Sequence, residues 1–190
     1  MINKFEQIKT QKDIPNFLIE NRLNNKICEV GVMKGDGIEN LIKCDPRLII
    51  GIDIWEDNNH LPTTNNMNQQ VMNYHYRESL KLMIKYPQLK LIKGLSADYV
   101  DLFPDNFFDF VYIDADHSYD GVKSDLHNWW SKVSVGGVLG GHDYFKYTSA
   151  YTFGVIEAVD EFLIQNNIPM SNFYVTPESF APSFFLYKDK

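Results

Sequence analysis

The sequence predicts an α/β fold in a single domain: a doubly wound, mostly parallel sheet that closes with an antiparallel hairpin. Strand-like and helix-like segments alternate through five rounds, and two further strand-like segments follow each other at the end. The segment Leu48–Ile54 is almost wholly apolar, as strands covered on both faces are. With 190 residues, 44% of them hydrophobic, the chain is large enough to form one domain over residues 1–190.

Short apolar segments bounded by turn residues mark the strands. In chain order they are Lys26–Val30, Leu48–Ile54, Leu89–Lys93, Phe107–Ile113, Gly137–Leu139, Asn172–Thr176 and Ser183–Tyr187. Helix-like segments separate the first five, which is typical of parallel strands, whereas the last two have little between them and predict the hairpin.

Apolar positions at helical spacing mark the segments between the strands. We expect helices after Asp13, over Gly37–Lys43 and Val71–Tyr86, after Ser96, and over Tyr119–Lys132 and Val155–Gln165. Asp13 is the expected cap of the first helix, with Pro15 in its first turn. The expected apolar positions of the third helix include Val71, Tyr74, Leu82 and Ile84, and those of the last are Val155, Ala158, Val159, Phe162 and Leu163.

The composition excludes several classes of protein. A formal net charge of −7 argues against a non-specific nucleic-acid surface, which needs clustered lysine and arginine. No apolar stretch approaches the length of a membrane span, and the first residues lack the apolar core of a signal peptide. Cys28 and Cys44 share no metal-ligand spacing, and Cys28 is expected to be a small buried residue. We therefore expect a cytoplasmic protein without nucleic-acid or membrane partners, and the sequence leaves open whether it forms a homo-oligomer.

A glycine-rich turn, "ICEVGVMKGDG" (27–37), follows the first strand. Its glycines, Gly31, Gly35 and Gly37, allow a ligand to approach the backbone closely, but their spacing is not the G-x-G-x-x-G of dinucleotide-binding proteins. Glu29 precedes the turn, where a carboxylate would repel a pyrophosphate but could accept a hydrogen bond from an ammonium group. Asp53 ends the second strand and could hold both hydroxyls of a ribose. Together these residues favour a nucleoside that carries an amino acid over NAD, and so disfavour an NAD(P)-dependent oxidoreductase.

These motifs resemble those of class I S-adenosylmethionine-dependent methyltransferases, in the branch of small, often metal-dependent O-methyltransferases similar to catechol and macrolide-sugar enzymes. "EVGVMKG" matches the first motif and "GIDI" the second, while "DFVYIDADHSYDGVKSDL" and "VGGVLGGHDY" match the later strands. The resemblance implies a Rossmann-like, mostly parallel seven-stranded sheet with an antiparallel last strand, and S-adenosylmethionine as cofactor. The positions that it assigns to the cofactor are Glu29, Gly31, Gly35, Asp53, Ile54, Trp55, Ser96 and Asp114. For Trp55 a place in the core is an equal alternative.

The same resemblance implies a divalent metal, Mg²⁺ or Mn²⁺, held at the ends of two consecutive strands. Its ligand positions correspond to Asp114, His142 and Asp143. His142 stands where an oxygen ligand is common, so it could bind a softer ion such as Mn²⁺ or contact only the substrate.

His117 is the expected general base, because neutral imidazole accepts a proton near physiological pH. Asp116 is the alternative, since related sugar enzymes use an aspartate there. A purely structural interpretation is that residues 116–118 begin a helix that Ser118 caps. The remaining polar and aromatic candidates are expected outside the site: His60, His75 and His127 at the surface, Asp120 and Asp125 as solvated helix residues, and Trp129 and Trp130 in packing.

The sequence thus predicts an O-methyltransferase acting on a small hydroxylated acceptor such as a sugar, a natural product or a phenol. The alternative is a non-catalytic S-adenosylmethionine-binding module with a regulatory or interaction role. A base beside carboxylates at 114–117 argues against that alternative, because a binding module needs no base. Acceptor specificity is expected to reside in residues 56–75 and 144–153.

Overall fold

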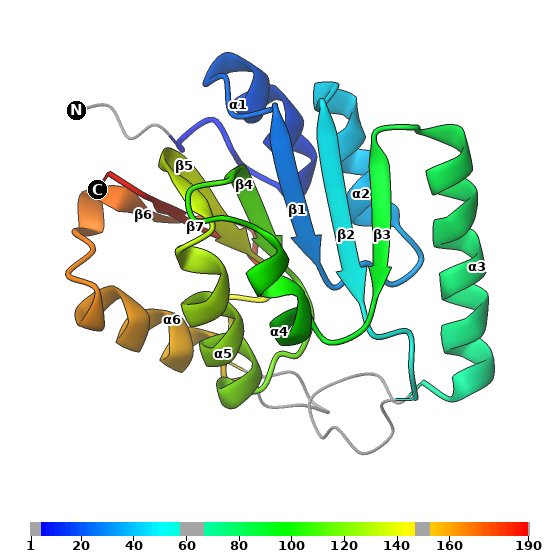
Figure 1. The fold of residues 1–190 in the computed structure, drawn as a ribbon. Helices are drawn as coiled ribbons and strands as arrows, with labels where there is room; N and C mark the ends of the chain where they lie inside the picture. The colour runs from blue at the N-terminus through cyan, green and yellow to red at the C-terminus, as the bar shows by residue number, and fades with distance from the viewer. Residues whose placement is uncertain (1–4, 58–66, 147–152, 190) are drawn as a thin grey trace.

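The computed structural model describes residues 5–57, 67–146 and 153–189, which form a seven-stranded sheet covered by helices on both faces (Figure 1). The strand order is β3-β2-β1-β4-β5-β7-β6. β1 to β5 run parallel, β7 pairs antiparallel with β5, and β6 pairs antiparallel with β7. The strands are β1 (Lys26–Val30), β2 (Leu48–Asp53), β3 (Leu89–Lys93), β4 (Phe108–Ile113), β5 (Val133–Gly141), β6 (Phe173–Val175) and β7 (Phe184–Tyr187). The predicted fold class, including the reversed last strand, is confirmed.

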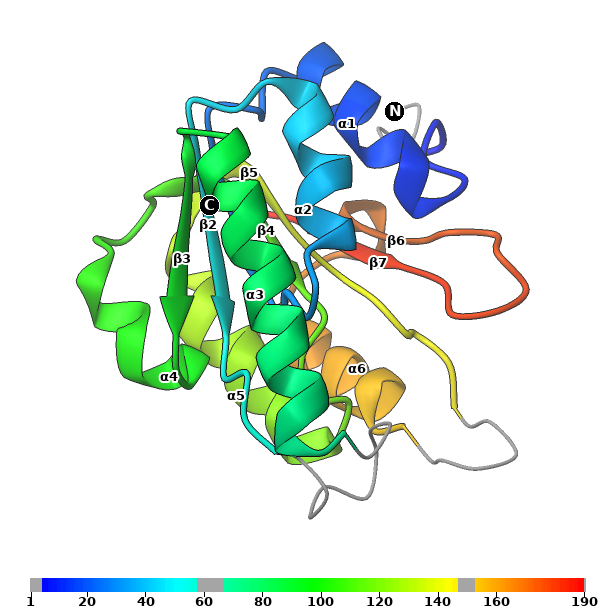
Figure 2. The same ribbon diagram turned by 90° about the vertical axis from the view of Figure 1, so that its right-hand side faces the viewer.

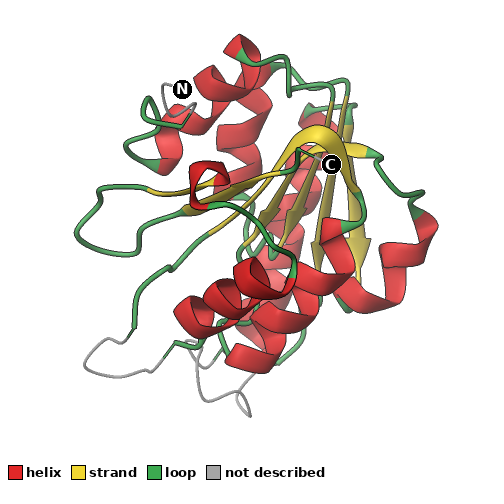
Figure 3. Cartoon of the chain, turned by 90° about the vertical axis from the view of Figure 1, so that its left-hand side faces the viewer, coloured by secondary structure: helices red, strands yellow, loops and turns green. Residues whose placement is uncertain are grey.

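The helices divide into two layers, seen from the two sides of the sheet in Figures 2 and 3. They are α1 (Ile14–Glu20), α2 (Asp36–Leu41), α3 (Gln69–Lys85), α4 (Ser96–Tyr99), α5 (Tyr119–Trp130) and α6 (Val155–Gln165). Side chains of α1 and α2 share one hydrophobic core, with α3 packed against it, whereas those of α5 and α6 share the other. No helix in the described ranges is both long and apolar enough to cross a membrane.

Two separate cores form because neighbouring residues of a strand point to opposite faces of the sheet. In β1, Ile27 belongs to the core under α1 and α2, and Cys28 belongs to the core under α5 and α6. Ile49 and Ile50 of β2 divide in the same way. The apolar segment of the sequence therefore corresponds to a strand buried on both faces, as expected.

α3 is the element whose buried face was predicted wrongly. Of the predicted apolar positions, Leu82 packs against the core, but Val71, Tyr74 and Ile84 are exposed. The buried residues of the helix are Met72, His75 and Ser79. The reason is a polar contact: the Ser79 hydroxyl donates to the carbonyl oxygen of Met33 in the glycine turn, 2.9 Å away. The expectation of a surface position for His75 is also wrong, while His127 is exposed as expected and His60 lies outside the described residues.

Two element ends also differ from the expectation. Asp13 precedes α1, with proline in the first turn, but its carboxylate accepts the N–H groups of Lys9 and Thr10 instead of capping α1. β5 extends to nine residues, and its pairing with β4 shifts register between Phe108 and Phe110.

Candidate active site

The carboxyl ends of β1, β2, β4 and β5 surround one cavity of about 790 Å³. Open parallel sheets place ligands at this edge. The predicted site residues that line the cavity are Glu29, Gly31, Asp53, Ile54, Ser96, Asp114, Asp116, His117, His142 and Asp143. Gly35 and Trp55 do not line it.

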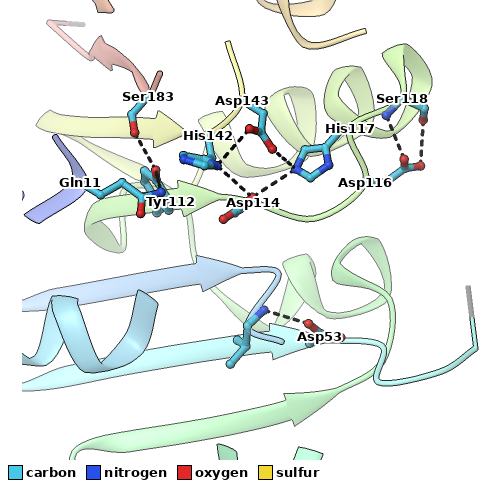
Figure 4. A network of polar contacts seen from close by, with 11 residues as sticks. Gln11, Asp53, Tyr112, Asp114, Asp116, His117, Ser118, His142, Asp143 and Ser183 are labelled. Carbon is cyan, nitrogen blue, oxygen red and sulfur yellow. Dashed lines mark hydrogen bonds and ion pairs between the residues drawn. The ribbon is translucent and has the colours of Figure 1, made fainter. Parts of the chain in front are cut away.

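Gly31 lets the exit of β1 lie directly against the exit of β4. Its φ of +90° favours glycine, and a Cβ atom there would lie 2.0 Å from the carbonyl oxygen of Asp114. The Asp53 carboxylate fixes the backbone of the two residues that follow Gly31. Its Oδ2 atom accepts the N–H groups of Val32 and Met33, at 2.9 and 2.8 Å (Figure 4). The turn and the second strand are therefore one hydrogen-bonded unit.

Gly31→Ala should be far more costly than Gly136→Ala, although both glycines have positive φ. Gly136 has a φ of +86°, and a Cβ atom there would meet its nearest neighbour only at 4.0 Å. We expect about 1–2 kcal/mol of lost stability at Gly136 from backbone strain alone. At Gly31 the clash with backbone atoms should raise the loss to about 3 kcal/mol or more. Chemical unfolding of both variants measures the difference, and equal losses would contradict the close approach of β1 to β4.

Gly35 and Trp55 lie in the framework of the site, whereas the sequence predicted both as cofactor contacts. Gly35 starts α2 with a φ of +100°, and a Cβ atom there would lie 2.4 Å from Leu82. The Trp55 side chain is fully buried, and its indole N–H donates to the carbonyl oxygen of Met33 at 2.7 Å. Trp55 N–H also donates to Asp53 Oδ1 at 2.8 Å. The core interpretation of Trp55 therefore holds.

Glu29 is a buried carboxyl group on the wall of the cavity. Its side chain lies against the first turn of α2, as the absence of a side chain at Gly37 allows. A Cβ atom added to Gly37 would lie 1.8 Å from Glu29 Oε1. Within the described residues, the buried Oε2 atom has no hydrogen-bond partner. Burial, followed by the charges of Asp114, Asp53 and Asp36, raises the pKa of Glu29 well above its usual value. Such a group suits a cationic ligand that restores its ionised form.

Asp125 is a site residue that the sequence analysis placed wrongly. It lines the cavity from α5, is buried, and accepts a hydrogen bond from the Ser96 hydroxyl at 2.6 Å. Burial raises the pKa of Asp125 to about 6. The sequence carried a signal for this, since Asp125 lies within the apolar stripe of Val122, Leu126 and Trp129.

Two histidines and two aspartates form a compact polar cluster at the exits of β4 and β5 (Figure 4). His117 lies between the carboxylates, with Nε2 at 3.2 Å from Asp114 Oδ1 and 3.1 Å from Asp143 Oδ2. His142 Nδ1 lies 3.3 Å from Asp143 Oδ1 and 3.8 Å from Asp114 Oδ1. Asp143 has a φ of +58°, a strained conformation that is often found at functional sites.

The carboxylates set the protonation of both imidazoles. Burial lowers the pKa of His117, but the hydrogen bond to Asp114 and the charges of Asp114 and Asp143 outweigh it. The pKa of His117 is therefore raised. The pKa of His142 is also raised, because its hydrogen bond to Asp143 and the charges of Asp114, Asp143 and Glu178 outweigh the effect of burial.

The donor set of this cluster fits a divalent ion. Ligand atoms of Asp114, His117 and Asp143 all lie within 4.8 Å of one another. The third ligand predicted from the sequence is His142 and not His117. His142 also lies close to both aspartates. Mixed carboxylate and imidazole donors suit Mn²⁺ at least as well as Mg²⁺.

Asp116 lies at the cavity wall but points away from this cluster (Figure 4). Its carboxylate accepts the N–H and the hydroxyl of Ser118, at 2.9 and 2.8 Å. Ser118 in turn caps α5 by accepting Gly121 N–H, as the sequence predicted. The geometry therefore favours His117 over Asp116 as the base.

Tyr112 forms a second polar group on the cavity wall that the sequence analysis did not single out. Its hydroxyl accepts a hydrogen bond from Gln11 Nε2 at 2.8 Å and lies 2.9 Å from the Ser183 hydroxyl. Burial raises the pKa of Tyr112 well above its usual value, so the phenol stays protonated. It connects the N-terminal segment and β7 to the site.

The strand order, with a cavity at the carboxyl ends of the parallel strands, is that of the Rossmann-like methyltransferase fold. Residues 28–144 match the model of the methyltransferase-domain family, and the chain belongs to that family. No curated protein sequence matches the chain.

Several solved structures share the fold at low sequence identity. The O-methyltransferase from Bacillus cereus in complex with S-adenosylhomocysteine has a TM-score of 0.64 and 12% identity, covering 94% of this chain and 80% of that one. The O-methyltransferase NovP has a TM-score of 0.64 and 17% identity, covering 95% of this chain and 78% of that one. Spermidine synthase from Thermotoga maritima has a TM-score of 0.60 and 16% identity. The alignment covers 90% of this chain but only 56% of the spermidine synthase.

Proposed function

We propose that the protein is an O-methyltransferase that moves the methyl group of S-adenosylmethionine to a hydroxyl of a small acceptor, assisted by a divalent metal. The observation that carries the proposal is the position of His117 between Asp114 and Asp143, in the cavity that also contains Gly31 and Asp53. The proposed base and the residues proposed to bind the cofactor thus line one cavity. Both cysteines are buried and free, which suits the cytoplasmic location that the sequence predicts.

The cofactor would lie across the exits of β1 and β2. Glu29 would accept hydrogen bonds from the ammonium of the methionine part, and Asp53 would accept them from the ribose hydroxyls. Ile54 would flank the adenine, while Ser96 would lie at its edge. Asp53 already accepts three backbone N–H groups, so its replacement would disturb the glycine turn as well as the ribose contact.

Methyl transfer to a hydroxyl requires a base that accepts the hydroxyl proton. The acceptor oxygen attacks the methyl carbon while the bond between this carbon and sulfur breaks. The electron pair of the broken bond stays on sulfur and gives a neutral thioether. A ring nitrogen of neutral His117 takes the hydroxyl proton, and Asp114 and Asp143 stabilise the imidazolium that results. A divalent ion held by Asp114, His142 and Asp143 would lower the pKa of the acceptor hydroxyl and orient its oxygen, and would leave His117 free to act as the base.

Calorimetric titration with S-adenosylmethionine, S-adenosylhomocysteine and NAD tests the cofactor assignment, and an acceptor screen with and without Mg²⁺ tests the reaction. Binding of S-adenosylhomocysteine together with methyl transfer to a hydroxyl would support the proposal. Binding without transfer to any acceptor would favour the non-catalytic module. Binding of NAD alone would overturn both.

The contact of Glu29 with the ammonium predicts a pH-dependent cofactor affinity. Ionised Glu29 attracts an ammonium and neutral Glu29 does not, so S-adenosylhomocysteine should bind more tightly as pH rises through the raised pKa of Glu29. Glu29→Gln should remove this dependence and weaken binding by about 10-fold or more, the effect of one lost hydrogen bond to a charged group.

Two controls accompany this titration. 5′-Methylthioadenosine, which lacks the amino acid, should bind both proteins equally well at every pH. Glu39→Gln changes a half-exposed glutamate on the same helix as Gly37 and should leave both ligands unaffected. An equal loss of both ligands in Glu29→Gln would show that Glu29 acts only on the structure of the turn.

A further inference from the structure

We propose that Asp125 of α5 recognises the base of the cofactor, and that its carboxylate accepts a hydrogen bond from the 6-amino group of adenine. The inference rests on the proposed function, because it assumes that the cofactor lies in the cavity with its ribose at Asp53. It gives a ligand to a buried acid that takes no part in the proposed methyl transfer.

Asp125 is a buried acid with few partners. It is 6% exposed, and among the described residues only the Ser96 hydroxyl donates a hydrogen bond to its carboxylate, to Oδ1 at 2.6 Å. The charged neighbour that affects its pKa is Asp116, which is also an acid and raises this pKa further. A carboxylate can accept several hydrogen bonds, and its burial without them is costly. A ligand that donates a hydrogen bond would therefore stabilise Asp125.

The free part of the carboxylate faces the cavity. Gly121, Ser124 and Asp125 all line it, and their spacing of three and four residues places them on one face of α5. α4 packs against α5, and Ser96 and Ala97 at its start line the cavity as well (Figure 1). Because Ser96 contacts Asp125 directly, these two walls enclose the same part of the cavity. A ligand group placed between α4 and α5 therefore meets Asp125.

The strand order determines which part of the cofactor reaches this place. β3 lies on the far side of β2 from β1, and its exit leads into α4. With the amino acid at Glu29 of β1 and the ribose at Asp53 of β2, the base extends toward Ser96 and Asp125. The 6-amino group is the hydrogen-bond donor of adenine, whereas the ring nitrogens beside it are acceptors that an ionised carboxylate repels. Asp125 is therefore suited to the amino group.

A purely structural role for Asp125 makes a different prediction. If its carboxylate only held Ser96 at the start of α4, its loss would weaken every ligand of the cavity to the same extent. Recognition of the amino group predicts a loss that depends on the presence of that group in the ligand. A pair of ligands that differ only in this group separates the two roles.

S-Adenosylhomocysteine and its 6-deamino analogue, in which hydrogen replaces the amino group, form this pair. Calorimetry at pH 8 compares them with Asp125 ionised, since its pKa is about 6. The wild type should bind S-adenosylhomocysteine about 10- to 100-fold more tightly than the analogue, the effect of one hydrogen bond to a charged group. Asp125→Ala should reduce this ratio to near 1, while the analogue binds at least as tightly as before and shows that the variant is folded.

Two further variants locate the effect. Asparagine keeps an acceptor oxygen without the charge, so Asp125→Asn should retain a ratio of about 3- to 10-fold, the effect of a hydrogen bond between neutral groups. Asp98→Asn makes the same substitution at an exposed acid of α4, two residues from Ser96, and should leave both affinities unchanged.

The failure of this inference can be told apart from that of the proposed function. If the wild type binds both ligands equally well, or if Asp125→Ala weakens both to the same extent, recognition by Asp125 is refuted and the cofactor assignment stands. If neither ligand binds the wild type, the proposed function fails and this inference fails with it.

Discussion

His117→Ala should lower the rate of methyl transfer by about 10²–10⁴-fold, the usual contribution of a general base. In the wild type, kcat/KM should rise with pH, because protonated imidazole cannot accept a proton. The carboxylates of Asp114 and Asp143 favour imidazolium and raise the pKa of His117, whereas a bound cation would lower it, so the pH at which the rise occurs reports whether metal is present. His117→Ala should abolish the rise and leave binding of S-adenosylhomocysteine nearly unchanged.

Asp116→Asn is the matched control for this experiment. Asp116 is the neighbouring residue, but its carboxylate is occupied by the N–H and hydroxyl of Ser118. We expect at most a small loss of rate, together with some loss of stability at the start of α5. If Asp116→Asn is instead the crippling change, and His117→Ala keeps the same rise with pH, the proton goes to Asp116.

The fold could be predicted from hydrophobic patterns because most elements bury simple apolar faces. α6 has the predicted bounds and the predicted buried residues. α3 could not be predicted in the same detail, since its buried face includes His75 and Ser79. That face is set by a hydrogen bond to Met33, a residue 46 positions away in the sequence from Ser79. Apolar periodicity carries no information about such a contact.

The site could be predicted to the level of strand exits, but not to the level of side-chain direction. Asp114 and Asp143 converge because their strands are neighbours in the sheet, which the alternation of elements implies. His117 and Asp116 are adjacent in the sequence, yet only His117 points into the polar cluster (Figure 4). Their directions depend on the irregular backbone between β4 and α5, where no simple periodicity applies. From the sequence, His117 could be preferred as the base only with Asp116 as the alternative.

Removal of divalent metal should abolish turnover, and Mg²⁺ or Mn²⁺ should restore it. An ion between Asp114 and Asp143 would stabilise the developing alkoxide by several kcal/mol, so its loss should reduce the rate by orders of magnitude. Affinity for S-adenosylhomocysteine should change little, because the ion would contact the acceptor and not the cofactor. Direct titration of the protein with Mn²⁺, followed by calorimetry, measures ion binding without reference to activity.

Asp143→Asn provides a variant that weakens the metal site without disturbing its backbone. Asparagine tolerates the left-handed conformation that Asp143 adopts at a φ of +58°, so the loss of one carboxylate charge should be the main change. We expect weaker Mn²⁺ binding and a matching loss of turnover, whereas Asp120→Asn, an exposed acid in the first turn of α5, should affect neither. A bound cation should also oppose the charges that raise the pKa of His117, so this pKa should fall when the ion binds. Full turnover after rigorous chelation, with the rise at the same pH, would assign Asp114 and Asp143 to direct contact with His117 and the acceptor instead.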